Sequence, residues 1–146
     1  MTTAADIVRS KSDPATYTIE PTATVFDAVT LMAQKNIGAL LVAQGQQVGG
    51  IVTEREVARN LVLKARSPKE TPVRDIMASP VMFVPPRHTS EECMALMTEH
   101  RVRHLPVMDG SRLIGVVSIG DLVKDIISQQ KFIIEQLEHY IAGERA

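Results

Sequence analysis

The chain contains one short pattern twice, as GIVTERE at residues 50–56 and as GVVSIGD at residues 115–121. Each copy is an apolar stretch that opens with glycine and ends in a hydroxyl residue, with a carboxylate three positions later. A short apolar run predicts a buried strand, and Ser/Thr-x-x-Glu/Asp is typical of the first turn of a helix. The sequence therefore predicts the same junction between a strand and a helix twice, 65 residues apart.

The repetition extends outward from this pattern over most of the chain. A shift of 65 residues superposes one half of the sequence on the other without a gap, and the coinciding residues are mainly glycines and core-type apolar residues. The identical pairs include Pro21 and Pro86, Thr24 and Thr89, Leu40 and Leu105, Gly45 and Gly110, Gly50 and Gly115, and Val52 and Val117. Residues of these kinds are what two copies of one fold share, so we predict tandem structural repeats.

Each copy predicts the same order of elements, which is strand, helix, strand, strand, helix. The expected segments are extended stretches at 17–19 and 81–84, helices at 25–35 and 90–100, strands at 39–42 and 104–108, strands at 48–52 and 113–117, and second helices that begin at Thr53 and Ser118. Thr24 and Thr89 are the expected N-caps of the first helices. The stretch 63–72 is polar and basic and contains two prolines, as expected for a linker.

The predicted fold class is α/β (α+β), built from tandem βαββα repeats with pseudo-two-fold symmetry and a long C-terminal helix. The expected division is a first repeat at 1–65, a linker at 66–72, a second repeat at 73–130 and a helical extension at 131–146. A three-stranded sheet buries one face at most. We therefore expect the two copies to bury their sheets and helices against each other, with equivalent clefts on either side of the axis.

The composition and charge exclude several classes of protein. Hydrophobic residues make up 45% of the chain, and the formal net charge of −1 offers no basic field for nucleic acid. Cys93 is the single cysteine, which excludes an internal disulfide, and the four histidines lack metal-ligand spacing. The first residues do not resemble a signal peptide, and no apolar run approaches the ~18 residues of a membrane span, so we expect a cytoplasmic protein that does not enter membranes.

The repeated junction has two interpretations. The more frequent one is a capping box, in which the hydroxyl and the carboxylate satisfy free N–H groups at the helix start. The other is a nucleotide site, because a helix N-terminus attracts phosphate and a carboxylate one turn further can hold a ribose. Glycine at the strand start would let a ligand approach the backbone closely. Both interpretations can hold in turn, with the cap replaced when a ligand binds.

Two tandem βαββα units that each close with Gly-h-h-Ser/Thr-x-x-Asp, where h is apolar, resemble the CBS domain pair, or Bateman module. The stretches 101–107 (RVRHLPV) and 73–77 (VRDIM) carry the same likeness, and 5–8 (ADIV) is a weaker counterpart of the second. The resemblance covers residues 5 to 130. It implies adenosine ligands, which are AMP, ADP, ATP, NAD or S-adenosylmethionine, in clefts between the copies, and a regulatory protein rather than an enzyme.

The resemblance assigns two sites. In the first, Asp121 would hold the ribose and Ser118 the phosphate, with Val117 and Gly120 in the same motif. Its adenine would lie against Tyr17, Thr18, Ile37, Gly38 and Ala39. In the second, Glu56 would hold the ribose and Thr53 the phosphate. The residues around its base and phosphates would be Val81, Met82, Val102, Arg103, His104 and Pro106, and Arg55 would add positive charge to either site.

The two predicted sites are not equivalent. Glu56 stands where the family usually has Asp, and the extra methylene moves the carboxylate, so a bidentate contact with a ribose is expected to be looser or lost. The second site has the better phosphate partners, Arg103 and His104, where the first repeat has Gly38 and Ala39. Those cations suit a monophosphate or a diphosphate bridge, so AMP is the first choice of ligand and NAD the second.

Two other functions remain open from sequence. One is a structural dimerisation module whose clefts are degenerate. The other is an enzyme acting on the nucleotide, with His104 as its base and Arg103 as its electrostatic stabiliser. The resemblance and an overhanging apolar helical stripe indicate a homodimer, and an effector protein in trans would read the signal. The stripe consists of Leu122, Ile126, Phe132, Ile133, Leu137, Tyr140 and Ile141.

Overall fold

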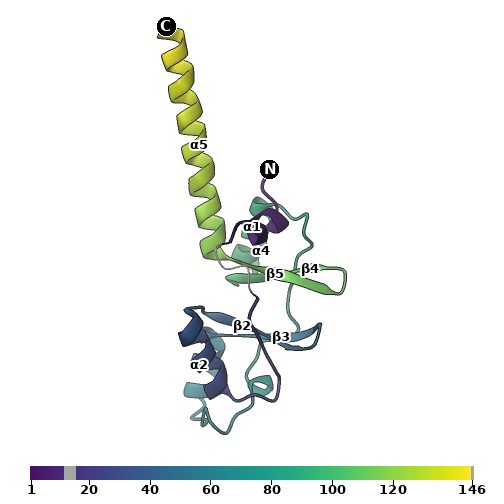
Figure 1. The fold of residues 1–146 in the computed structure, drawn as a ribbon. Helices are drawn as coiled ribbons and strands as arrows, with labels where there is room; N and C mark the ends of the chain where they lie inside the picture. The colour runs from purple at the N-terminus through teal and green to yellow at the C-terminus, as the bar shows by residue number, and fades with distance from the viewer. Residues whose placement is uncertain (12–15, 146) are drawn as a thin grey trace.

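The computed structural model describes residues 1–11 and 16–145. The two repeats are stacked with their sheets facing each other and their helices on the outer sides (Figure 1). The first repeat contains β1 (Thr18–Ile19), α2 (Val25–Lys35), β2 (Ala39–Gln44), β3 (Gln47–Thr53), α3 (Glu54–Glu56) and a π-helical segment (Val57–Val62). The second contains a 3-10 turn (Val73–Asp75), α4 (Ser90–His100), β4 (His104–Asp109), β5 (Arg112–Ser118) and α5 (Ile119–Arg145). A further helix, α1 (Ala4–Ser10), precedes both repeats.

The tandem βαββα plan is confirmed, and the sheets match across the 65-residue shift. The first sheet has the order β1-β2-β3, with β1 parallel to β2 and β2 antiparallel to β3. In the second sheet β4 pairs with β5, and the expected strand at 81–84 is reduced to one parallel bridge between Val84 and Val107. Both hairpins turn at a glycine with positive φ, Gly45 (58°) and Gly110 (62°), a conformation that favours glycine.

Helices α2 and α4 begin and end where the sequence predicts, for the same chemical reason. The hydroxyls of Thr24 and Thr89 accept hydrogen bonds from backbone N–H groups of the first turn. Each helix ends at a residue in the left-handed region, Asn36 (φ 53°) and Arg101 (φ 55°), which directs the chain back into a strand. The predicted end of the helix at residue 100 and start of the strand at residue 104 are therefore confirmed.

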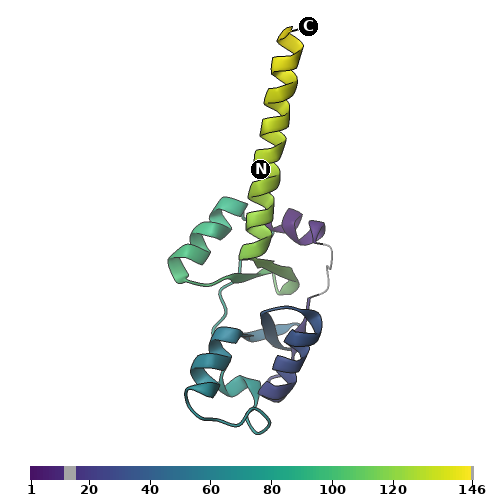
Figure 2. The ribbon, with the colours of Figure 1, turned by 90° about the vertical axis from the view of Figure 1, so that its left-hand side faces the viewer.

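The second helices of the two repeats differ greatly in length. In the first repeat α3 spans 3 residues and continues for 6 residues as a π-helical segment. In the second, α5 runs for 27 residues and projects beyond the body of the protein (Figures 1 and 2). Leu122 is fully buried near its start, whereas the side chains of residues 131–143 are exposed. The exposed apolar residues there are Phe132, Ile133, Ile134, Leu137, Tyr140 and Ile141.

Each repeat has a hydrophobic core of its own, and the two cores exchange the segments that precede them. Ile7 and Val8 of α1, which lead into the first repeat, pack with Leu105 in the core of the second. Val73 and Ile76, which lead into the second repeat, pack in the core of the first. The expectation that the copies bury helices against each other thus holds for α1, which packs against the second repeat, whereas α2 and α4 pack in the cores of their own repeats.

The first glycines of the repeated pattern make room for the exchanged segments. A Cβ atom at Gly115 would lie 2.6 Å from Cγ1 of Val8, and a Cβ atom at Gly50 would clash with Sδ of Met77. These glycines were expected to let a ligand approach the backbone. The structure gives a different reason, since side chains of the protein itself occupy the space above them.

Gly115→Ala is expected to lower the free energy of unfolding by about 1–3 kcal/mol, because the added methyl overpacks against Val8. Gly49→Ala is the matched control, since the nearest heavy atom to its Cβ is 4.0 Å away. Urea unfolding measures both. The added Val8→Ala change should reduce the cost at residue 115, and a Gly115→Ala protein as stable as wild type would contradict this packing.

Candidate functional site

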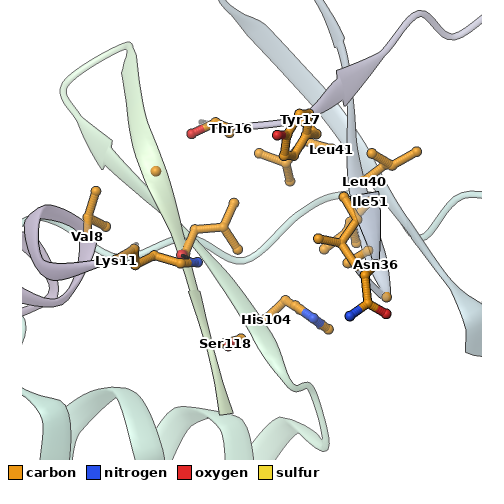
Figure 3. Close-up of a pocket in the computed structure, with 15 residues that line it drawn as sticks. Val8, Lys11, Thr16, Tyr17, Asn36, Leu40, Leu41, Ile51, His104 and Ser118 are labelled. Atoms are coloured by element: carbon orange, nitrogen blue, oxygen red, sulfur yellow. Dashed lines mark hydrogen bonds between the residues drawn. The ribbon is translucent and has the colours of Figure 1, made fainter. Parts of the chain in front are cut away.

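A cavity of about 270 Å³ lies between the two sheets, and we call it the inter-sheet cavity (Figure 3). The first repeat contributes Thr16, Tyr17, Asn36, Ile37, Gly38, Ala39, Leu40, Leu41 and Ile51, and the second repeat with α1 contributes Val8, Lys11, His104, Gly115, Val116 and Ser118. The arrangement thus brings together Ser118 and the Tyr17 and Ile37–Ala39 segments, as the sequence predicts for the first site. Apolar walls with few polar groups are what small-molecule pockets offer.

Asp121 lies beside this cavity at the N-terminus of α5 and forms a reciprocal cap there. Its Oδ2 accepts a hydrogen bond from the N–H of Ser118 at 2.9 Å, and the hydroxyl of Ser118 accepts one from the N–H of Asp121 at 3.2 Å. The capping interpretation of the motif is therefore correct in this structure. Lys11 adds a second contact to the same oxygen, with Nζ 3.1 Å from Oδ2.

A larger groove of about 1020 Å³ runs along the Glu56 side of the repeats. We call it the arginine-lined groove, because Arg55, Arg59, Arg101 and Arg103 line it together with Glu54 and Glu56. Thr53 and Val102 also line it, so much of the second predicted site is brought together. Gly120, assigned to the first site, lies on this groove.

Glu56 is engaged in the same way as Asp121. Its Oε1 accepts hydrogen bonds from the N–H of Thr53 at 2.9 Å and from the Thr53 hydroxyl at 2.6 Å. Arg55 is held across the groove, where Nη1 donates to the carbonyl oxygen of Arg101 at 2.7 Å. This bond links α3 of one repeat to the end of α4 in the other.

His104 lines both the inter-sheet cavity and the arginine-lined groove. Burial lowers the pKa of its imidazole, and the positive charges of Lys11 and Arg103 lower it further, while Asp121 and Glu56 act in the opposite direction. The net direction is downward from 6.5, so the ring is neutral at pH 7. Gly38, Ile51 and Ser118 are also shared, and the two spaces therefore have a common wall.

Six predicted site residues line neither space, and one of them is Asp121, which lies beside the inter-sheet cavity. Val117 is fully buried in the second core, because alternation along β5 turns Val116 and Ser118 toward the cavity and Val117 away from it. Thr18 is exposed on β1, and Met82 packs against the second core. Pro106 is buried in β4, and Val81 lies outside both linings.

Sequence reasoning missed Lys11, Arg59 and Arg101. Lys11 follows α1, and its place in the cavity depends on the exchange of the segments between the cores. Arg59 faces the groove from the π-helical segment, whose residue spacing differs from that of an α-helix. Arg101 is the left-handed cap of α4, and the αL geometry sets its direction.

Other chemically active groups are accounted for by packing. Cys93 is fully buried in the second core, and burial raises the pKa of its thiol, as expected of a structural cysteine. Over residues 1–11 and 16–145, no group of three or more His, Cys, Asp and Glu residues is placed to hold a metal ion. Within the same ranges, no helix is both long and apolar enough to cross a membrane.

The fold and the two spaces define a pair of βαββα modules with clefts where the modules meet. The sequence model of the CBS domain matches residues 4–63 and 73–128, and the chain belongs to this family. CBSX3, a mitochondrial CBS domain-containing protein of Arabidopsis thaliana, is 37% identical over 97% of this chain and 73% of its own length. YhcV of Bacillus subtilis, also a CBS domain-containing protein, is 32% identical over 77% of this chain and 80% of its own.

Solved structures agree with this assignment. A signal-transduction protein with CBS domains from Burkholderia ambifaria is 54% identical, with a TM-score of 0.85 over 88% of this chain and 96% of the other. A hexameric CBS-CP12 protein from bloom-forming cyanobacteria is 32% identical, with a TM-score of 0.74 over 84% and 71%. These relatives are named for their CBS domains or for signal transduction rather than for a reaction. The chain is therefore a CBS-domain protein.

The lowered pKa of His104 makes stability depend on pH. As the pH falls below 6.5, the unfolded chain binds a proton at this residue before the folded protein does, so the free energy of unfolding decreases. The decrease is expected from 6.5 down to the lower folded pKa, with no contribution from His104 above 6.5. Urea unfolding at about pH 7.5 and about pH 5.5 should show a smaller loss in His104→Asn than in wild type. His139→Asn, at an exposed position on α5, is the control, and equal losses in all three proteins would contradict the assignment.

Proposed function

We propose that this CBS-domain protein binds an adenine nucleotide, with AMP as the first choice and NAD as the second, and signals its presence without catalysing a reaction. The observation that carries the proposal is the position of Ser118 and Asp121. They lie at the N-terminus of a 27-residue helix, where Ser118 lines a cavity whose opposite wall is built by the other repeat, and Asp121 is hydrogen-bonded to Ser118 beside it. A nucleotide there would touch both repeats, which a sensor requires.

The cavity and the adjoining start of α5 supply the chemistry for each part of AMP. Leu41 and Ile51 offer apolar surface to a flat base, and Tyr17 adds an aromatic ring. The carboxylate of Asp121 can accept the ribose hydroxyls, while the hydroxyl of Ser118 and the N-terminus of α5 suit the phosphate. The volume of about 270 Å³ lies near the lower end of the range for small-molecule pockets, which favours a mononucleotide over NAD here.

The arginine-lined groove is a candidate for a second, more highly charged ligand. The lining of the groove contains four arginines and only the two carboxylates of Glu54 and Glu56. Arginine binds phosphate through paired hydrogen bonds. Its volume of about 1020 Å³ accommodates a dinucleotide such as NAD. The longer side chain of Glu56 supports a looser ribose contact than that of Asp121. We therefore assign different ligands to the two spaces.

Contacts between α1, α4 and α5 provide a route from the cavity to a partner. Lys11 at the end of α1 binds Asp121, and near the other end of α1 the hydroxyl of Thr2 accepts a hydrogen bond from Gln129 at 2.9 Å. Ser90 at the start of α4 donates to Asp125 at 2.9 Å. A ligand that disturbs Asp121 would therefore act on the base of the projecting helix, which an effector in trans can read.

Asp121→Ala is expected to abolish measurable AMP binding, because the ribose loses its carboxylate. Isothermal titration calorimetry is the direct measurement, since removal of the cap also lowers stability by about 1 kcal/mol and would confuse a melting assay. Asp109→Ala, at the exposed end of β4, is the matched control and should bind as wild type does. Wild-type protein without affinity for AMP, NAD, ADP or ATP would favour a purely structural module, and full affinity in Asp121→Ala would exclude this ribose site.

We also propose that the protein is a homodimer in which the outer half of α5 packs on a second copy. Six large side chains exposed on this projecting segment favour burial against a partner. Light scattering after size exclusion should give the mass of a dimer. The double change Ile133→Glu with Leu137→Glu should give a monomer, and Glu135→Gln with Glu138→Gln should not. A monomeric wild type would contradict this role of α5.

A further inference from the structure

Lys11 lines the inter-sheet cavity and contacts the carboxylate that we propose for the ribose of AMP. Its Nζ lies 3.1 Å from Oδ2 of Asp121 and donates to the carbonyl oxygen of Val116 at 3.0 Å. Its side chain is 30% exposed and that of Asp121 is 16% exposed, so the pair is largely withdrawn from water. Figure 3 shows Lys11 reaching into the cavity on the side of Ser118, with Tyr17 and Ile51 on the opposite wall.

Lys11 is also the source of positive charge in this cavity at neutral pH. The lining residues that the structure describes include no arginine and no second lysine. His104 also lines the cavity, but its imidazole is neutral at pH 7 because its pKa is lowered. A phosphate entering the cavity would therefore meet one ammonium group and hydrogen-bond donors that carry no formal charge.

The position of Lys11 conflicts with a full ribose contact. Oδ2 of Asp121 already accepts a hydrogen bond from the N–H of Ser118 and forms an ion pair with the ammonium of Lys11. A carboxylate oxygen accommodates about two donors, so a ribose held by both oxygens requires one of these to leave. Lys11 is the mobile one, because it is carried on a flexible four-carbon chain, whereas the N–H of Ser118 belongs to the backbone.

We propose that Lys11 makes the inter-sheet cavity select phosphorylated nucleosides over uncharged ones. The ribose would replace the ammonium on Asp121, and the ammonium would turn to the phosphate that the same ligand brings next to Ser118. An uncharged nucleoside would displace Lys11 from its carboxylate and leave a partly buried ammonium without an anion, which is unfavourable. This inference rests on the proposed AMP site and adds its selection for charge.

The test compares AMP with adenosine in wild type and in Lys11→Gln by isothermal titration calorimetry. Lys11→Gln should weaken AMP binding at least about tenfold, because a charge-assisted hydrogen bond to phosphate is lost. Adenosine binding should stay equal or strengthen, so the ratio of the two affinities falls. Lys11→Arg keeps the charge and should keep the preference, and Lys64→Gln, at an exposed position in the turn after the π-helical segment, is the matched control.

Each result decides between separate claims. An unchanged AMP affinity in Lys11→Gln would overturn the role of Lys11 and leave the AMP site standing, provided that Asp121→Ala still abolishes binding. An equal loss of AMP and adenosine would reduce Lys11 to a structural support for Asp121 and would also overturn the selection. A wild-type protein that binds neither ligand would remove the proposed AMP site and this inference together.

Discussion

The exchange of leading segments between the two cores is the constraint on which the rest of the structure depends. Val8 packs over Gly115 in the second repeat, and Met77 lies over Gly50 in the first. One face of each small sheet is thereby packed against a segment that comes from outside its own repeat. The other face of the sheet is turned toward the opposite sheet. Because the exchanged segments complete each core, neither core requires the opposite sheet to cover it, and space remains between the two sheets for the inter-sheet cavity.

The same exchange makes the two spaces chemically unequal. Because α1 lies on the second repeat, Lys11 at its end reaches Asp121 and gives the inter-sheet cavity a single ammonium. In the first repeat the corresponding place is taken by residues 73–77, and the positive charge of the groove comes from the arginines of α3, the π-helical segment and α4's end. Two copies of one motif are thus set in surroundings of different volume and charge.

The sequence was sufficient for features set by local chemistry. Helices α2 and α4 match the predicted ranges because their ends are set by residues close in sequence. Thr24 and Thr89 cap the first turns, and the chain leaves each helix at a left-handed residue, Asn36 or Arg101. The capping at Ser118 and Asp121 was readable for the same reason. Lys11 could not be predicted, since its place depends on a contact between segments more than one hundred residues apart. Val117 was assigned to the site because it lies next to Ser118 in the motif. The alternation of side chains along β5, however, directs Val117 toward the core.

The central claim is that the junction of β5 and α5 exchanges a cap for a nucleotide. A crystal structure of the protein with AMP tests it most directly. The account predicts ribose hydroxyls within hydrogen-bonding distance of both carboxylate oxygens of Asp121, phosphate beside Ser118, and adenine between the two sheets. AMP bound elsewhere, with the contacts of Asp121 to Ser118 and Lys11 unchanged, would contradict it.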